Sequence, residues 1–155
     1  MATSGPDPLI RPASRADVPA IVALLRDDPL GREREGEPDD PAYGAAFEAV
    51  ERDPNCTIYV MEDAGAVIGC AQLILLAGLS RRGMLRGQIE AVRIAASRRN
   101  AGLGGRLVAH LVEAARARGC GTVQLTSDKT RLEAHRFYGS LGFTASHEGF
   151  KLTFA

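Results

Sequence analysis

A strand that runs directly into a glycine-rich helix start is the feature that most constrains this sequence. Residues 89–94 (IEAVRI) have the alternation of a β-strand, a short turn follows, and apolar residues then recur at helical spacing. Three glycines lie within residues 102–105, next to two arginines at 98–99. The first amides of a helix lack partners and carry partial positive charge, so this helix start suits a phosphate or pyrophosphate group.

Other glycine-rich loops bind nucleotides, but this one departs from both common forms. A dinucleotide-binding loop follows the first strand and has an acidic residue about 20 positions further on. Here the glycines are in the middle of the chain, and Gln124 stands at that distance. A Walker loop needs Gly-Lys-Ser or Gly-Lys-Thr, which the sequence lacks. A structural interpretation stays open, in which the glycines only allow close packing of helix and strand.

Two motifs resemble those of the GNAT N-acetyltransferase family. The spacing Arg99-x-x-Gly102-x-Gly104 matches the family signature R/Q-x-x-G-x-G/A. Residues 134–143 (AHRFYGSLGF) resemble the later A-x-x-F-Y-x-x-x-G-F segment. The two motifs occur in the family's order, with a helix and a strand between them, and a weaker likeness covers nearly the whole chain from Leu9.

The predicted fold class is α/β, in the α+β sense. The pattern predicts a flexible tail at residues 1–8 and a single domain over 9–155. The elements expected in it are a strand at 9–11, a helix to about 26, a loop at 28–41, a helix at 42–52, a hairpin of strands 57–61 and 67–75, the central strand and its helix, a strand at 122–126, a helix at 131–141, and one or two strands in 143–154. The resemblance implies the GNAT acyl-CoA N-acyltransferase fold. This is a mixed, mostly antiparallel sheet of six or seven strands flanked by about four helices, which splays between its two parallel central strands to admit the cofactor.

Composition excludes several classes of function. The 155 residues carry 19 basic and 19 acidic side chains, so the net charge favours neither nucleic acid nor a membrane surface as a partner. Three cysteines form no C-x-x-C pair, and three histidines have no metal-ligand spacing, so no metal site is expected. No signal peptide or membrane span can be recognised, and the sequence predicts a cytoplasmic protein with reduced thiols.

Acetyl transfer from a thioester to an amine needs a proton acceptor and a proton donor, and two residues are candidates. The period of two predicts that Glu90 shares a strand face with Val92 and Ile94, so it would accept the amine proton, through water. The alternative is an ion pair with an arginine. The resemblance gives Tyr138 the role of general acid; a phenol pKa near 10 lies above a thiol pKa near 8.5. Its alternative is a packed ring whose hydroxyl bonds to the backbone.

The resemblance also implies a set of residues that bind acetyl-CoA, mainly through their backbone. They lie on the central strand and at the following helix start: Val92, Arg93, Ile94, Arg99, Asn100, Ala101, Gly102, Leu103, Gly104 and Gly105. Arg131 stands where many family members carry an asparagine that contacts the cofactor. It is left unassigned, as are His135, His147 and Glu148.

The sequence therefore predicts an acetyl-CoA-dependent N-acetyltransferase that acts on a primary amine of a small molecule, a peptide or a protein. The rival interpretation is a catalytically inactive acyl-CoA-binding sensor or subunit with the same fold. Tyr138 together with Glu90 favours the enzyme, since a pure binder does not need them. Homodimers are frequent in this family, but neither an interface nor the acceptor amine can be read from the sequence.

Overall fold

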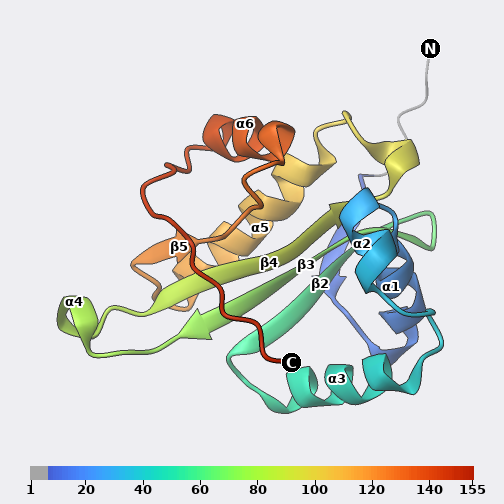
Figure 1. Cartoon of the computed structure of the whole chain (residues 1–155), viewed down its shortest axis with the longest axis horizontal. Coiled ribbons are helices and arrows are strands. Elements are labelled where there is room, and N and C mark those ends of the chain that lie inside the picture. Colours follow the sequence, from blue (N-terminus) through green and yellow to red (C-terminus); the bar gives the residue numbers. More distant parts are fainter. Residues whose placement is uncertain (1–6) are drawn as a thin grey trace.

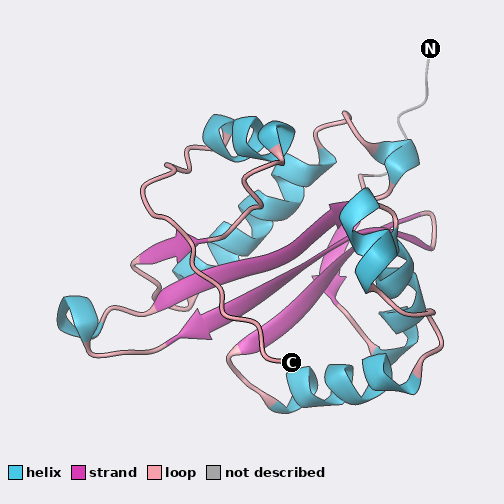
Figure 2. Cartoon of the chain, in the orientation of Figure 1, coloured by secondary structure: helices cyan, strands magenta, loops and turns pink. Residues whose placement is uncertain are grey.

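A sheet of five strands, with helices on both faces, organises residues 7–155, which are the residues that the computed structural model describes (Figure 1). Figure 2 shows the central position of the sheet among the helices. The strands are β1 (Leu9–Pro12), β2 (Cys56–Asp63), β3 (Ala66–Leu76), β4 (Arg86–Ile94) and β5 (Thr122–Gln124). The helices are α1 (Val18–Arg26), α2 (Pro29–Arg34), α3 (Pro41–Arg52), α4 (Ser80–Gly83), α5 (Leu103–Ala117) and α6 (Leu132–Ser140), with 3-10 turns η1 (Arg15–Asp17) and η2 (Ala96–Arg98). Most of the predicted tail, residues 1–6, lies outside the described residues.

The sheet has the order β1-β2-β3-β4-β5. Neighbouring strands are antiparallel except β4 and β5, which are parallel and joined through α5. This confirms the mixed, mostly antiparallel sheet with two parallel strands. The predicted count of six or seven strands is wrong for the described chain, because residues 143–155 form none. Alternation alone does not make a strand, since a strand also needs an edge to pair with.

The hairpin and the long helices follow the sequence pattern. Ala64 and Gly65 between β2 and β3 both have positive φ, 49° and 81°, as a two-residue type I′ turn requires. The helices predicted at 42–52 and 131–141 appear as α3 and α6, and the first helix ends at Arg26 as predicted.

Helices cover the sheet from two sides. Leu107 and Leu111 of α5 are fully buried against Leu73 of β3 and Ile89 of β4. Helices α1 and α3 cover the other face near β2, where Val22 and Phe47 belong to one cluster. Helix α5 packs on β4. The start of this helix therefore lies next to Ile94, at the C-terminal end of that strand.

The segment predicted as a loop at 28–41 contains the short helix α2, so this prediction is wrong in part. Asp28 begins the helix, since its Oδ1 accepts a hydrogen bond from the Gly31 amide at 2.7 Å, and Pro29 takes a first-turn position where no N–H is needed. Gly31 packs so closely on α1 that a Cβ would lie 1.8 Å from the carbonyl oxygen of Leu25. Proline and glycine, which suggested a loop, here serve helix entry and packing.

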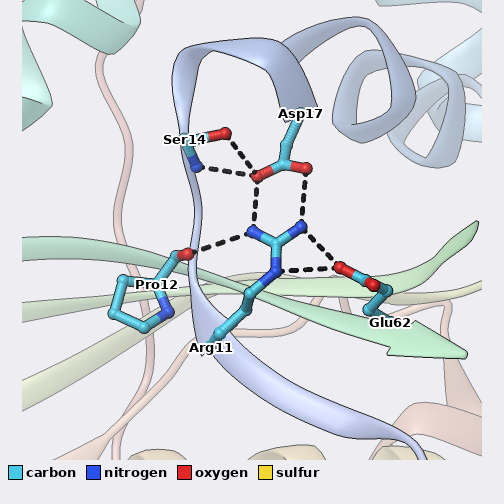
Figure 3. Close-up of polar contacts among 5 residues, drawn as sticks. All are labelled: Arg11, Pro12, Ser14, Asp17 and Glu62. Carbon is cyan, nitrogen blue, oxygen red and sulfur yellow. Dashed lines mark hydrogen bonds and ion pairs between the residues drawn. The ribbon is translucent and has the colours of Figure 1, made fainter. Parts of the chain in front are cut away.

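A hydrogen-bonded cluster around Arg11 ties β1 to η1 and β2 (Figure 3). The guanidinium donates to both oxygens of Asp17 at 2.8 and 3.0 Å and, through Nε and Nη2, to Glu62 at 2.9 and 2.7 Å. Asp17 also accepts from the Ser14 amide at 2.7 Å, which is half of a capping box. These bonds, with the Arg11 fork first among them, lower the pKa of Asp17 to about 2.

Candidate functional site

The two parallel strands separate after a short pairing. β4 and β5 pair from Arg86 with Thr122 to Gln88 with Gln124. From there β4 continues to Ile94, and no described strand pairs with it on that side. Figure 2 shows β4 extending well past the short β5. The predicted splay is confirmed, and the backbone of residues 89–94 has an open edge toward β5.

Helix α5 begins from a left-handed turn. Asn100 and Gly102 have φ angles of 63° and 74°, and Gly102 is the N-cap. No side chain caps the helix, so the amides of residues 103–105 lack a side-chain acceptor, and no carbonyl of the helix itself can reach them. These amides fit a phosphate group in the way the sequence predicted, while phosphate binding itself stays a prediction.

Two of the glycines also have a packing role. A Cβ on Gly104 would lie 3.2 Å from Cζ of Phe137, and one on Gly105 would lie 3.6 Å from Cδ2 of Leu141. Both neighbours belong to the end of α6, so these glycines let α6 approach the start of α5. Gly102 has no atom within 4 Å of such a Cβ, but its positive φ favours glycine. The packing interpretation therefore holds for Gly104 and Gly105. It does not compete with ligand binding, because the backbone amides of both residues remain free.

The arginines before the glycines make contacts within the protein. Arg99 Nε donates to the carbonyl oxygen of Ile94 at 3.1 Å, and its Nη2 donates to that of Asp27 at 3.0 Å. Arg98 forms an ion pair with Asp63 at 2.6 Å. The turn before α5 is thus held against the end of α1 and against the β2–β3 hairpin. A direct phosphate contact by Arg99 requires its guanidinium to turn away from Asp27.

A β-bulge interrupts β4 beside the open edge. β3 pairs Gln72 with Glu90 and Cys70 with Arg93, so two residues of β4 oppose one residue of β3. Ala91 has a φ of 54° at this point. The Cys70 thiol, whose pKa burial raises to about 12, lies 3.7 Å from the carbonyl oxygen of Ala91. The extra residue reverses the alternation of side chains along the rest of the strand.

The prediction that Glu90 shares a face with Val92 and Ile94 is therefore wrong. Val92 and Ile94 pack with the α5 cluster, whereas Glu90 lies on the opposite face with Arg93. Glu90 is exposed and accepts a hydrogen bond from Gln88 Nε2 at 2.9 Å. Within residues 7–155 it forms no ion pair, so the alternative of an arginine partner finds no support. Its carboxylate is free to meet a ligand on this face.

Arg93 makes a side-chain contact that sequence reasoning missed. Its Nε lies 3.0 Å from Oδ2 of Asp28, and both side chains are only 11% exposed. The pair has poor hydrogen-bond geometry, and Arg93 Nη1 donates to the carbonyl oxygen of Val92 at 2.9 Å. Burial alone would raise the pKa of Asp28, but the Gly31 amide and nearby arginine charges outweigh it and lower that pKa. This contact joins the start of α2 to the end of β4. It was not predicted, because residues 28–41 were expected to form a loop.

Tyr138 lies on α6. We call the region between residues 89–94 of β4, the start of α5 and Tyr138 the cleft. Its ring packs edge-on against Phe137 and Phe143, with centroids 5.0 and 5.9 Å away. No hydrogen bond to its hydroxyl is found among the described residues, so the alternative of a hydroxyl fixed by the backbone is not observed. Burial raises the pKa of Tyr138; the charge of Glu90 adds to this, and Arg131 and Arg93 oppose it. The phenol therefore keeps its proton at neutral pH.

Those charge effects also show which residues the fold brings together. Glu90 and Arg93 lie on β4 and Arg131 caps α6, yet the charges of all three act on the phenol of Tyr138. Arg131 is the N-cap residue of α6, and its charge also acts on the carboxylate of Asp28. In the sequence, this role was indicated by the arginine itself, which stands where many family members carry an asparagine.

The remaining polar residues near α6 have structural partners. His135 Nε2 lies 2.8 Å from the carbonyl oxygen of Asp128, which stabilises the turn before the helix. Lys129 and Glu148 form an exposed ion pair at 2.8 Å, and His147 lies beside Ser146 Oγ at 2.7 Å.

Residues 7–155 hold neither a cluster suited to a metal ion nor a helix that could span a membrane. No group of three or more His, Cys, Asp or Glu side chains there is arranged to hold a metal ion. Within the same residues, no helix is long and apolar enough to cross a membrane. The three cysteines are free thiols.

Comparison with known proteins supports the interpretation of the two motifs. The sequence model of the acetyltransferase (GNAT) family matches residues 18–143. Glucosamine 6-phosphate N-acetyltransferase of Trypanosoma brucei brucei is 35% identical over 95 residues, which are 61% of this chain and 63% of that protein. The chain thus spans less than two thirds of that relative's length.

Solved structures agree over almost the whole length. The crystal structure of a transcriptional regulator from Bacillus halodurans C-125 is 40% identical, with a TM-score of 0.92 over 95% of this chain and 99% of that one. An acetyltransferase structure with acetyl-CoA from Clostridium acetobutylicum has a TM-score of 0.73 over 94% and 96% of the two chains, and at 17% identity it shows the fold alone. The match over residues 18–143, on a sheet that splays where the family fold does, establishes that this chain belongs to the acetyltransferase (GNAT) family.

Proposed function

We propose that this protein transfers an acetyl group from acetyl-CoA to the amine of a small molecule or a peptide by direct attack on the thioester. The observation that carries the proposal is the place of the Tyr138 hydroxyl, which has no hydrogen-bond partner within residues 7–155 and lies on the helix that packs on the start of α5, beside its free amides. A protein that only binds an acyl-CoA needs the amides but no proton donor.

Acetyl-CoA fits the groups that the splay leaves open. The free amides of residues 103–105 suit its pyrophosphate, and the unpaired backbone edge of residues 89–94 suits its amide-containing arm. When bound, it supplies an acetyl thioester. The carbonyls of Val92 and Ile94 each accept one arginine hydrogen bond and keep a second lone pair for such a ligand.

Two residues of the chain then carry out the two proton transfers. The Glu90 carboxylate accepts the proton of the amine through water, as the new C–N bond forms. Backbone N–H groups of residues 92–94 are the donors for the carbonyl oxygen while it carries negative charge. Tyr138 gives its proton to the departing thiolate, and its pKa, which is raised above the ordinary value of 10.0, keeps the phenol protonated until that step. The C–S bond breaks and free thiol leaves.

The name of the trypanosomal relative suggests where to look for the acceptor. Because that relative is a glucosamine 6-phosphate N-acetyltransferase, amino sugars and their phosphates belong first in a panel that also holds aminoglycosides, polyamines, amino acids and N-terminal peptides. Thiol release from acetyl-CoA in the presence of one of these amines is the expected result. Tight acetyl-CoA binding with no thiol release for any amine would favour the rival function, an acyl-CoA-binding sensor. The Bacillus halodurans relative is named a transcriptional regulator, which keeps that rival in view.

The phosphate site can be tested with a charge pair at Ala101, which is exposed beside the helix start. Ala101→Glu offers the free amides a competing carboxylate and repels the pyrophosphate, so calorimetry should show acetyl-CoA affinity lower by about tenfold. Ala101→Gln is the matched neutral control and should bind like the parent. Equal affinity in both variants would contradict pyrophosphate binding at this helix start. A substitution at Gly104 is less informative, since it would also displace Phe137.

A further inference from the structure

Arg131 is a half-buried arginine whose side chain has no partner in the described protein. It is the N-cap residue of α6, and within residues 7–155 its guanidinium takes part in no hydrogen bond or ion pair. A guanidinium carries five N–H donors, and polar groups removed from bulk water are normally matched by acceptors. The donors of Arg131 are therefore available to a ligand.

The position of Arg131 directs these donors toward the acceptor side of the cleft. Arg131 and Tyr138 are seven residues apart, close to two helical turns, so they share one face of α6. The charge of Arg131 also acts on the carboxylate of Asp28, at the start of α2. Asp28 Oδ2 lies 3.0 Å from Arg93 Nε at the end of β4, which lies between α2 and α6 (Figure 1). Arg131 thus faces the side of β4 that carries Glu90 and Arg93, and not the side that α5 covers.

Most charged groups around Arg131 already have partners within the protein. The ion pairs there are Asp28–Arg93 at 3.0 Å, Arg34–Glu35 at 3.4 Å and Lys129–Glu148 at 2.8 Å. Asp128, three residues before Arg131, accepts hydrogen bonds from the amide and the hydroxyl of Thr130 at 2.9 and 2.6 Å. None of these groups forms an ion pair with the Arg131 guanidinium in the described chain.

One positive and one negative side chain, Arg131 and Glu90, are then left without an ionic partner in residues 7–155. Both charges act on the phenol of Tyr138, so both lie near the proposed proton donor. A molecule that carries an amine and an anionic group is complementary to this pair, with the amine at the carboxylate and the anion at the guanidinium. Arginine suits phosphate and carboxylate groups in particular, because its planar fork can bind two oxygens at once.

We propose that Arg131 binds an anionic group, a phosphate or a carboxylate, of the amine that this protein acetylates. This inference rests on the proposed function, since it takes the amine to lie at Glu90. It narrows the acceptors to amines that carry such a group, and it makes Arg131 a residue that determines specificity. The pyrophosphate of acetyl-CoA is not the occupant, because α5, whose free amides suit it, packs on the other face of β4.

Calorimetry with matched pairs of amines tests the proposal without requiring turnover. Glucosamine 6-phosphate and glucosamine differ by a phosphate, and L-alanine and L-alaninamide differ by a carboxylate. Coenzyme A is present throughout, so that it occupies the amides of α5. In at least one pair the anionic member should bind about tenfold more tightly, and the pair that shows the preference identifies the anion. Equal affinities within both pairs would overturn the proposal.

Arg131→Gln should abolish this preference by weakening the anionic member about tenfold and leaving the neutral member unchanged. Arg131→Lys keeps the charge without the planar fork and should retain part of the preference. Arg136→Gln is the matched control, because Arg136 is exposed on the same helix and its charge is not among those that act on Tyr138 or Asp28. An equal loss in Arg136→Gln, or a loss of acetyl-CoA affinity in Arg131→Gln, would overturn the proposal.

Thiol release from acetyl-CoA, measured with the same pairs, separates this proposal from the proposed function. Turnover that is equally fast with the anionic and the neutral member of each pair would keep the acetyltransferase and overturn the anion site. A binding preference that Arg131→Gln abolishes, without thiol release for any amine, would keep the anion site and count against the catalytic function.

Discussion

The Arg11 cluster and the cleft between β4 and α6 use polar groups in opposite ways. In the cluster, every nitrogen of the Arg11 guanidinium has a hydrogen-bond partner within 3.3 Å. In the cleft, the hydroxyl of Tyr138 and the first amides of α5 have no partner among the described residues. Saturated hydrogen bonding fixes a scaffold, whereas unsatisfied groups in one cleft are available to a ligand.

This contrast predicts that substitutions in the two regions affect different measurements. Changes in the cluster should lower the free energy of unfolding and leave catalysis alone. Changes in the cleft should lower kcat and leave the free energy of unfolding nearly unchanged. A residue that affected both measurements equally would weaken the distinction.

The largest effect is expected for Tyr138→Phe. The variant keeps the ring that packs against Phe137 and Phe143 and removes only the hydroxyl. If that hydroxyl protonates the thiolate, kcat should fall by about 10²- to 10⁴-fold, equivalent to about 3–5 kcal/mol. Steady-state kinetics with any accepted amine measures this, and calorimetry should show unchanged acetyl-CoA affinity. A near-normal kcat would remove Tyr138 from the mechanism.

Next in size is Arg11→Met, which should act on stability alone. It leaves the Asp17 carboxylate, 9% exposed, without its ionic partner and should lower the free energy of unfolding by about 3 kcal/mol. Urea denaturation measures the loss. Arg11→Lys is the control: it keeps the charge but cannot bond to Asp17 and Glu62 with a planar fork, so its loss should be intermediate. A fall in kcat per folded molecule would contradict the separation of scaffold and cleft.

The cluster and the cleft also differ in how far the sequence predicted them. The helix that follows the Ser14–Asp17 capping box and the glycine-rich start of α5 have local patterns, and both were predicted. The bulge at Ala91 was not, because alanine is an ordinary strand residue and nothing nearby in the sequence marks its positive φ. The predicted face of Glu90 was therefore wrong, although the predicted strand is confirmed.

Other errors have the same physical origin. Contacts between residues that are far apart in the sequence cannot be predicted from local patterns. The Asp28–Arg93 contact joins residues from different elements and could not be read from either segment. One or two last strands were expected in residues 143–154, but within the described chain these residues pair with no strand. The packing of Gly104 on Phe137 likewise depends on where α6 lies.

A smaller effect is expected for Glu90→Gln, since this carboxylate works through water. We expect a loss in kcat of about 10²-fold, the lower end of general-base catalysis, with unchanged acetyl-CoA affinity. The variant should also change the shape of the kcat–pH profile, because the parent loses its general base on protonation of the carboxylate and the variant has no such base to lose. Gln88→Leu, which removes the hydrogen bond to Glu90 but not the carboxylate, is the matched control and should cost much less. A pH profile identical to that of the parent would mean that Glu90 takes no proton.

The smallest effect expected is the part of the stability lost in acid that Asp17 of the cluster contributes. The folded protein holds the pKa of Asp17 at about 2, below its ordinary value of 3.8, mainly through the Arg11 hydrogen bonds. A depressed carboxylate pKa stabilises the fold above the unfolded value and loses that effect as the pH falls, so about 2 kcal/mol should disappear between about pH 4 and pH 2. Tyr138 contributes nothing in this range, because its raised pKa keeps it protonated throughout. Other carboxylates also titrate there, so the measurement is the difference in free energy of unfolding between the parent and Asp17→Asn at successive pH values. That difference should shrink as the pH falls, and a constant difference would show that the Arg11 contact is no stronger than one with solvent.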